Sequence, residues 1–446
     1  MLEYILWIVE HLKTSIFITF SFFYFQNYSL IDASLKLVVS IIGSLFLLIV
    51  YLIYNSWRNV PSQQFIDWTE YFESNKLNNY KGKRVPISLF VDYYLNGDIT
   101  LKKNMLEIMQ YRYGFFHFKL DLYYLKFFLT TFIQQLMGHD VNSDRSEIVP
   151  VYNQGNDFYS WFLGTPMIYT SGIYENEEQT LEQAQNNKLE YIAKKTLIQR
   201  EKVKNHLDIG CGWGTLCRYF SKNYNVNSTG IAIASEQIEW CKEKAKEENN
   251  EAKFECIDYR DLSKIKKYDI ITCLEMAEHV GIKNYQEFLK QVYNILEDDG
   301  VLYFQVAGLR RQWKFEDLCW GLFMGRYIFP AADASCPIGW VSSQLERAGY
   351  EVMEVKNMGV HYNKTITHWY ENWEKSKEKV LEKYGEWWYR LWILFLGWSQ
   401  AIAAQGSSTV FMITCTKNLE TDKKSDILGG ILNRTELNIP PKKKTI

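Results

Sequence analysis

The chain has 446 residues, of which 47% are apolar, so it can bury at least one large core and has room for two parts. Lysine and arginine number 50 against 52 acidic residues, and a chain with this balance is a poor candidate for binding nucleic acid. The eight cysteines include no C-x-x-C pair and no cysteine and histidine cluster at metal-ligand spacing, which argues against a zinc site or a disulfide framework.

Two hydrophobic segments near the amino terminus predict a transmembrane helical hairpin within residues 1–60. Residues 37–54 contain no charged residue and are close to the length that crosses a hydrocarbon core. Residues 12–25 are shorter and contain Lys13, and we expect them to form the second span. A signal peptide is the competing interpretation, but Glu3 and Glu10 replace its usual basic start. Basic residues after residue 57 place both ends of the hairpin in the cytosol, and an aromatic content of 16% fits a membrane interface.

Residues 61–150 are expected to form a membrane-proximal helical region. Within it, residues 115–137 crowd aromatic and aliphatic side chains with few charges. This composition fits either a helix that lies along a membrane surface or a buried packing helix.

Residues 151–418 alternate between strand and helix patterns from about residue 180 onward, which predicts a Rossmann-like, doubly wound parallel α/β sheet. Strands are predicted at residues 207–209, 228–233, 254–257, 269–274, 301–306 and 409–416, and helices at 181–193, 235–248 and 285–296. Residues 309–330 interrupt the alternation of strands and helices with an insertion rich in tryptophan and phenylalanine, which is a candidate lid over an apolar substrate. Residues 364–404 are again predicted to be helical. Residues 419–446 form a polar tail.

The stretch LDIGCGWG at residues 207–214 is the predicted cofactor loop. Its glycine spacing is close to the dinucleotide fingerprint without matching it. Asp208 precedes the glycines and Trp213 lies inside the loop, which is unlike a pyrophosphate site. Since a carboxylate suits a positively charged ligand, S-adenosylmethionine fits better than NAD, and an ordinary tight turn is the alternative.

Several separated motifs carry a resemblance to a known family. They are LDIGCGWG, YTSG at residues 169–172, Gln185 with Lys188, DYRD at 258–261, EHVG at 278–281 and HY at 361–362. Together they resemble the cyclopropane fatty-acid synthase family of S-adenosylmethionine-dependent enzymes, which implies a class I methyltransferase fold. The runs CLEMAEHVG and WGLFMGRYIFPAADAS, with the paired spans, are similar to the eukaryotic sphingolipid 9-C-methyltransferases of that family.

The resemblance implies which residues hold S-adenosylmethionine. Tyr169 and Thr170 would close over its methionine end, Gly210 and Gly212 would pass beneath it, and Tyr259 and Arg260 would flank the adenine. The other implied cofactor residues are Asp208, Cys211, Trp213, Gly214, Gln237, Asp258 and Leu274. The family's polar pair for the ribose is matched at Gln237 but not at Ala232. As a structural alternative, Asp258 caps its loop and Arg260 pairs with Asp261.

The implied reaction starts with an alkene that attacks the sulfonium methyl group, leaving a carbocation on the neighbouring carbon. An alkene is a poor nucleophile, so alignment and exclusion of water must supply much of the rate. The aromatic residues of the insertion would either stabilise the cation or simply pack an acyl chain; they are Trp313, Phe315, Trp320 and Phe323.

Loss of a proton then decides the product: removal from the transferred methyl group closes a cyclopropane ring, and removal from the methylated carbon gives a methyl branch. In the cyclopropane synthases a bicarbonate ion held by a glutamate, a histidine and a tyrosine is the base. Glu278 and Tyr362 match the first and third, whereas Gln305 stands at the histidine position and Ser171 at a family cysteine. Glutamine can still hydrogen-bond an anion, so bicarbonate stays open. Glu275 is a further carboxylate that could contact the cofactor's ammonium group.

Both departures favour a methyl branch over ring closure. The resemblance to the sphingolipid 9-C-methyltransferases then implies that the branch is added at C9 of an unsaturated sphingoid base, in a ceramide or glycosylceramide. The alternatives are a cyclopropane synthase acting on phospholipid acyl chains, an amine N-methyltransferase and a degenerate membrane scaffold. A sphingolipid substrate and a hairpin anchor imply the endoplasmic reticulum membrane, with the catalytic domain in the cytosol. The sequence leaves the oligomeric state undetermined.

Overall fold

The structure is a computed structural model that describes residues 63–127, 149–262, 266–330 and 336–420, with residue 332 and some positions between 43 and 55. The predicted span at residues 12–25, half of the span at 37–54 and the tail beyond residue 420 lie outside the described residues. Among the residues that are described, no helix is both long enough and apolar enough to cross a membrane.

The chain divides into two compact units, each assembled from separated segments. The first, here called the helical unit, comprises Met1–Val151, Ala307–Ile338 and Gly359–Thr409. The second, the sheet unit, comprises Tyr152–Val306, Gly339–Met358 and Val410–Ile446. The insertion and the carboxyl-terminal helices therefore belong to the same unit as the segment before residue 127.

The sheet unit is built on a seven-stranded sheet with the order β10-β11-β9-β8-β5-β6-β7. Its strands are β5 (Asn205–Ile209), β6 (Asn227–Ala232), β7 (Lys253–Cys256), β8 (Tyr268–Leu274), β9 (Leu296–Leu309), β10 (Tyr350–Asn357) and β11 (Ser408–Lys417). The pairs β5–β6, β5–β8, β6–β7 and β8–β9 are parallel. The strand order reverses between β5 and β8, and α/β sheets bind ligands at the carboxyl ends of strands at such a point.

The prediction of a purely parallel sheet is wrong at one end, because β10 runs antiparallel to β11. The sequence did not reveal β10, since its side chains are mostly half-buried or exposed and form no apolar run. An edge strand of this kind has one side of its backbone unpaired within the sheet and does not need the apolar pattern of a central strand.

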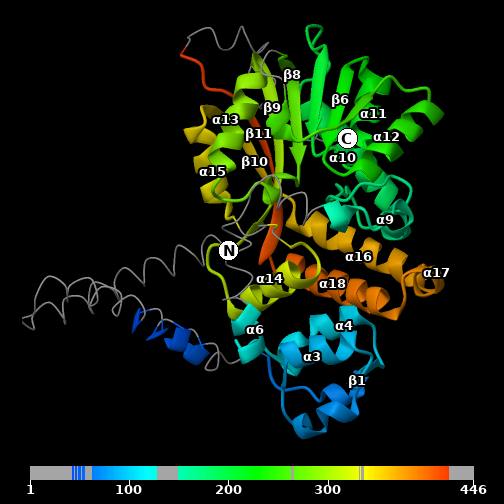
Figure 1. Cartoon of the computed structure of the whole chain (residues 1–446), viewed down its shortest axis with the longest axis vertical. Helices are drawn as coiled ribbons and strands as arrows, with labels where there is room; N and C mark the ends of the chain where they lie inside the picture. Colours follow the sequence, from blue (N-terminus) through cyan, green and yellow to red (C-terminus); the bar gives the residue numbers. More distant parts are fainter. Residues whose placement is uncertain are drawn as a thin grey trace, which may run out of the picture. The chain divides into compact units, whose positions relative to one another are not determined.

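Helices flank this sheet, with α13 and α15 on one side and α11 and α12 on the other in Figure 1. The helices of the unit are α9 (Asn156–Leu163), α10 (Leu181–Lys195), α11 (Thr215–Tyr224), α12 (Ser235–Glu247), α13 (Tyr285–Ile295) and α15 (Ile338–Arg347). Helix α10 begins at a capping box, in which Thr180 and Gln183 satisfy each other's backbone N–H groups. Its buried face includes the polar residues Gln185 and Lys188.

In the helical unit, residues 68–127 form short helices and two small sheets. These elements are β1 (Phe72–Glu73) paired with β3 (Thr100–Leu101), β2 (Val85–Pro86) paired with β4 (Phe116–His117), α3 (Ile87–Leu95), α4 (Met105–Gln110), α5 (Arg112–Phe115) and α6 (Leu122–Phe127), with three-ten turns at Trp68–Glu70 and Asn75–Tyr80. Aromatic rings fill the core, with Phe90 centred 5.0 Å from Phe72 and 4.6 Å from Phe116. Phe115 and Phe116 are fully buried, so packing is the role of this described part of residues 115–137.

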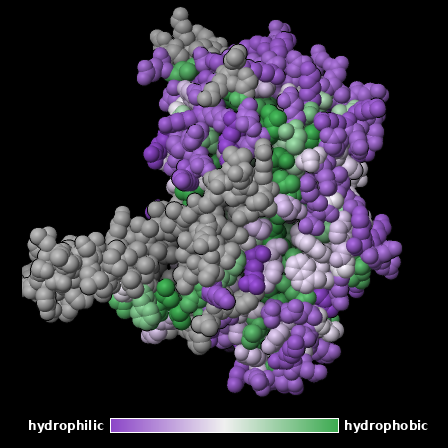
Figure 2. Space-filling view, viewed as in Figure 1, coloured by the Kyte–Doolittle hydropathy of each residue, from purple (hydrophilic) through white to green (hydrophobic). Residues whose placement is uncertain are grey.

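The insertion forms α14 (Phe315–Tyr327), and the stretch predicted as one helical region is divided into α16 (Gly359–Lys375), α17 (Lys377–Lys383) and α18 (Glu386–Ala404). Gly385, with a φ of 85°, separates the last two. On the face shown in Figure 2, hydrophilic side chains cover most of the described surface and hydrophobic ones form smaller areas between them. All eight cysteines are free thiols.

Candidate cofactor and catalytic site

The LDIGCGWG loop joins β5 to α11 through a left-handed backbone. Gly210 and Gly212 have φ values of 78° and 53°, which side chains rarely adopt. A Cβ atom on Gly210 would lie 2.5 Å from Cγ of Met276, whereas one on Gly212 would meet no atom within 4 Å. Gly210 is therefore required by packing, and Gly212 leaves open space in which a ligand can approach the backbone.

Backbone donors of this loop are already engaged with the neighbouring strand. The N–H groups of Gly210 and Cys211 both donate to the carbonyl oxygen of Ile231, at 2.9 and 3.0 Å. Trp213 is buried, and its Nε1 donates to Oδ1 of Asn156 at 2.7 Å. A pyrophosphate loop directs its backbone N–H groups at the ligand. The loop therefore suits a nucleoside ligand without a pyrophosphate.

Asp208 ends a buried chain of hydrogen bonds across β6, β5 and β8. Thr272 Oγ1 donates to Asp208 at 2.6 Å, and His206 contacts Thr272 Oγ1 through Nε2 at 2.9 Å and Ser228 Oγ through Nδ1 at 2.6 Å. Because the single proton of Thr272 goes to the carboxylate, Thr272 accepts from Nε2–H, and Ser228 donates to Nδ1. Burial lowers the pKa of His206 to about 3 and raises that of Asp208 to about 6. The imidazole is neutral and its tautomer is fixed.

Helix α10 holds the segment predicted to cover the methionine end of the cofactor. Lys188 Nζ donates to Thr170 Oγ1 at 2.5 Å, and Gln185 Nε2 donates to the Thr170 carbonyl oxygen at 2.9 Å. Burial lowers the pKa of Lys188, and the charges of Glu275 and Asp208 oppose this shift. From the sequence, Gln185 and Lys188 are identified only as part of the family resemblance. Their signal of a role is that they are polar residues on an otherwise apolar helix face.

The neighbours of Thr170 are also packed into this segment. The Tyr169 ring meets the rings of Tyr159 and Phe162 edge-on, with centroids 5.7 and 5.4 Å away. Ser171 is fully buried, and its hydroxyl donates to the carbonyl oxygen of Gly172 at 3.1 Å. The described contact of Ser171 is thus with the local backbone.

Asp258 follows β7 and uses only one of its two carboxylate oxygens within the described residues. Oδ1 accepts from the backbone N and from Nε of Arg260, both at 2.9 Å, so Asp258 does cap its turn. Oδ2 is buried and accepts no hydrogen bond from a described residue. Because a buried acceptor without a partner is unfavourable, Oδ2 fits a ligand donor such as an amino group. Tyr259 follows Asp258 in the chain, and its ring packs edge-on against that of Phe288, with centroids 4.9 Å apart.

Two further predicted cofactor residues lie in this sheet unit. Gln237 is buried in the first turn of α12, and Leu274 ends β8. With the open space at Gly212 and the open acceptor of Asp258, these placements fit S-adenosylmethionine.

Gln305 lies on β9, opposite Leu274 on β8. Its Nε2 donates to Oε1 of Glu275 at 2.6 Å. Since an ionised carboxylate only accepts, the NH2 group must face Glu275, and Gln305 Oε1 is left buried without a hydrogen-bond partner among the described residues. Gln305 therefore offers an acceptor, whereas an anion needs donors.

Glu278 is buried in the three-ten turn Ala277–His279 that follows β8. The adjacent His279 lies with its Nε2 3.2 Å from the hydroxyl of Tyr152. Burial raises the pKa of Tyr152, and the charges of Glu278 and Glu275 raise it further. Sequence reasoning missed Tyr152, because it precedes the first strand of the sheet and belongs to no recognisable pattern.

The predicted base ligand Tyr362 and the predicted aromatic residue Phe323 belong to the helical unit rather than to the sheet unit. Tyr362 is half-buried in α16 of the helical unit, where its ring centroid lies 6.2 Å from that of Trp369. The other residues predicted for the cofactor and for proton removal lie in the sheet unit, and the pairing of Tyr362 with Glu278 stays a prediction. Phe323 is fully buried with its ring centroid 5.4 Å from that of Trp398, so its role is packing.

Comparison with known proteins agrees with this geometry. The family model described as mycolic acid cyclopropane synthetase matches residues 139–413. The chain is 41% identical over 379 residues to sphingolipid C9-methyltransferase 2 of Gibberella zeae, covering 83% of this chain and 72% of that one. It is 42% identical over 358 residues to the sphingolipid C9-methyltransferase of Candida albicans, covering 78% and 69%.

Among solved structures, the cyclopropane synthase MmaA2 from Mycobacterium tuberculosis has the same fold. It superimposes with a TM-score of 0.58 at 24% identity, covering 62% of this chain and 99% of that one. The predicted class I methyltransferase fold is confirmed for the catalytic part. The chain belongs to the mycolic acid cyclopropane synthetase family of S-adenosylmethionine-dependent enzymes, and within it to the group of the sphingolipid C9-methyltransferases.

Proposed function

We propose that the chain transfers a methyl group from S-adenosylmethionine to C9 of an unsaturated sphingoid base, in a ceramide or glycosylceramide, and leaves a methyl branch. Identities of 41% and 42% to two sphingolipid C9-methyltransferases over most of the chain support the substrate. The observation that carries the choice of product is the hydrogen bond from Gln305 to Glu275.

S-adenosylmethionine, when bound, supplies an electrophilic methyl group. We assign its binding to the loop after β5, to the Tyr169 and Thr170 segment and to Asp258. The carboxylates of Asp208 and Glu275 suit a cofactor with positive charge. Lys188 limits the repulsion between these two carboxylates and holds Thr170 in place.

Glu278 is our candidate for the base that removes a proton from the methylated lipid. It is 8% exposed, and a buried carboxylate is a better proton acceptor than a solvated one. Bicarbonate, the base of the cyclopropane synthases, fits less well, because the Gln305 amide group is committed to Glu275 and its free atom is an acceptor. We therefore route proton removal through Glu278 without a bound bicarbonate.

We also infer that the enzyme is anchored in the endoplasmic reticulum membrane, with its catalytic part in the cytosol. A sphingolipid substrate is embedded in a bilayer, and the uncharged stretch at residues 37–54 has the length of a span. Its described positions include large hydrophobic side chains that are exposed, namely Phe46, Leu47, Val50, Tyr51 and Tyr54. Exposed apolar side chains in such a number suit a lipid environment.

The second candidate is a cyclopropane synthase acting on phospholipid acyl chains, which the family membership brings into consideration. Both reactions add one CH2 group, so the mass of the product does not separate them. Ozonolysis does, because only the methyl-branched product keeps a double bond.

The test is lipid mass spectrometry, with ozonolysis, of cells that express the chain and are fed methionine with a labelled methyl group. We expect a labelled, methyl-branched sphingoid base with the wild type and its loss with Glu278→Gln. Glu287→Gln is the matched control, since Glu287 is exposed on α13. Label confined to cyclopropane acyl chains would contradict the proposal.

A further inference from the structure

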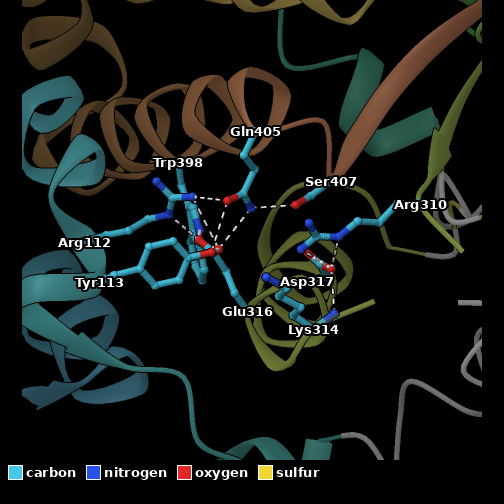
Figure 3. A network of polar contacts seen from close by, with 9 residues as sticks. All are labelled: Arg112, Tyr113, Arg310, Lys314, Glu316, Asp317, Trp398, Gln405 and Ser407. Atoms are coloured by element: carbon cyan, nitrogen blue, oxygen red, sulfur yellow. Dashed lines mark hydrogen bonds and ion pairs between the residues drawn. The ribbon is translucent and has the colours of Figure 1, made fainter. Parts of the chain in front are cut away.

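A buried cluster of charged and polar side chains joins three separated segments of the helical unit (Figure 3). Arg112 and Tyr113 come from α5, Glu316 comes from α14, and Gln405 follows α18. The side chains of Arg112 and Glu316 are only 6% and 2% exposed. Hydrogen bonds within the cluster join residues far apart in the chain: Arg112 and Glu316 are 204 positions apart, and Gln405 and Glu316 are 89 apart.

Both oxygens of Glu316 are fully engaged. Oε1 accepts from Arg112 Nε and, at 3.3 Å, from Trp398 Nε1. Oε2 accepts from the Tyr113 hydroxyl, from Arg112 Nη2 at 3.3 Å and from Gln405 Nε2 at 3.0 Å. The same Nη2 donates to Gln405 Oε1 at 2.7 Å. The carboxylate is thus held from two other segments at once.

The adjacent carboxylate, Asp317, fixes the start of α14. Arg310 Nε and Nη2 donate to it at 2.9 and 3.0 Å, and the backbone N of Lys314 donates to it at 2.8 Å. Gln405 Nε2 donates to Ser407 Oγ at 2.5 Å, and Arg310 N donates to the Ser407 carbonyl oxygen at 2.7 Å. Figure 3 shows the two carboxylates reaching different partners from the first turn of one helix.

A buried ion pair contributes little net stability, because removing two charges from water offsets most of their attraction. A shift that separates the two charges leaves them buried and unpaired, which is strongly unfavourable, so the pair disfavours other arrangements of the segments that carry it. Here the arrangement is the rotation and axial position of α14 relative to α5 and α18. Phe315, the first residue of α14, and Trp313, two residues before it, are only half-buried and lie next to this cluster in the chain.

We propose that the Arg112–Glu316 pair positions α14 for the lipid substrate, so that the segment of residues 63–127 determines how the long chain is bound. This rests on the proposed function, in which the substrate is a lipid. The segment lies outside residues 139–413, which the family model matches. Lipid recognition therefore depends on residues beyond the part that defines the family.

Cofactor affinity serves as the reference against which an effect on lipid binding is compared. The residues assigned to S-adenosylmethionine lie in the sheet unit, whereas the cluster lies in the helical unit. A change at Arg112 or Glu316 should consequently alter lipid kinetics and leave cofactor affinity unchanged.

The test compares the full-length wild type, Arg112→Met and the double variant Arg112→Met with Glu316→Met. The measurements are thermal unfolding, S-adenosylhomocysteine affinity by calorimetry, and kcat and KM for the lipid in mixed micelles. Lys76→Met is the control, because Lys76 forms an exposed ion pair with Asp98 in the same unit.

We expect Arg112→Met to unfold at a lower temperature, because it leaves a buried unpaired carboxylate. The double variant should recover the melting temperature. It should bind the cofactor product as tightly as the wild type, yet have a kcat/KM for the lipid that is lower by about tenfold or more, mainly through KM. Full lipid activity in the double variant would overturn the proposal, and so would a parallel loss of cofactor affinity. A wild type that methylates only phospholipid chains would refute the sphingolipid substrate, while the ratio between variant and wild type would still test the pair.

Discussion

Gln305 donates its side-chain amide to Glu275, with 2.6 Å between Nε2 and Oε1. In the cyclopropane synthases that this chain resembles, a histidine at the position of Gln305 helps to hold the bicarbonate base. Here the amide group is committed to a carboxylate, and the remaining oxygen is an acceptor. This pair links one sequence difference to the product that we propose.

Gln305→His should therefore shift the product from the methyl branch toward the cyclopropane ring. An imidazole can donate a hydrogen bond and carry positive charge, both of which favour a bound anion. The ratio is measured by proton NMR of the purified lipids, in which cyclopropane methylene protons are resolved. Gln305→Asn is the control, and it should lower the rate without producing rings. An unchanged ratio in Gln305→His would show that this position does not select the product.

Asp258→Asn should weaken the binding of S-adenosylhomocysteine by about ten- to a hundredfold, because a missing or opposed hydrogen bond to a buried group corresponds to about 1–3 kcal/mol. Asparagine keeps one oxygen for the backbone N of Arg260 but puts an NH2 group where Oδ2 lies. Calorimetry measures the affinity. Asp261→Asn, an exposed carboxylate three residues later, is the matched control. Equal effects of the two substitutions would rule out a specific contact through Oδ2.

The sequence predicted the central strands because buried parallel strands are short apolar runs between helices, as at β5 and β8. It did not predict β10, whose half-exposed residues form no such run. It indicated Asp208 and the glycines, since the loop is continuous in the chain. It could not indicate that Glu316 is paired with Arg112, because no local pattern relates residues 204 positions apart. Contacts of this kind are specified only by tertiary packing.

Lys188→Met should weaken the binding of S-adenosylhomocysteine by about tenfold or more and that of S-adenosylmethionine by less. Without the lysine, the charges of Asp208 and Glu275 lose a nearby cation, and Thr170 loses a donor. The sulfonium of S-adenosylmethionine carries a positive charge that partly replaces the lysine, whereas the thioether of S-adenosylhomocysteine is neutral.

The ratio of the two dissociation constants, measured by calorimetry, separates this electrostatic role from a packing role. Lys194→Met, at an exposed position on the same helix, is the control and should leave both constants unchanged. If Lys188→Met weakens both ligands equally, the lysine acts through packing alone.

His206 and Asp208 belong to one hydrogen-bond chain but have opposite effects on stability as the pH changes. The pKa of His206 is lowered from 6.5 to about 3 by burial, so below pH 6.5 the unfolded chain binds a proton that the native chain does not. Its contribution is complete above pH 6.5 and is lost as the pH falls, by about 1.4 kcal/mol per pH unit. The pKa of Asp208 is raised from 3.8 to about 6, so its contribution is complete below pH 3.8 and is lost as the pH rises to 6.

His206→Asn should therefore remove the acid sensitivity and leave the opposite trend of Asp208. Between pH 7 and pH 5 the stability advantage of the wild type over the variant should shrink by about 2 kcal/mol, since a pH interval of about 1.5 units lies below the ordinary pKa of histidine. Urea unfolding at the two pH values measures the difference. His368→Asn, a partly exposed histidine of α16, is the control. An advantage that stays constant with pH would mean that the native chain takes up a proton at His206 as readily as the unfolded chain, and that the neutral imidazole is not fixed by Thr272 and Ser228.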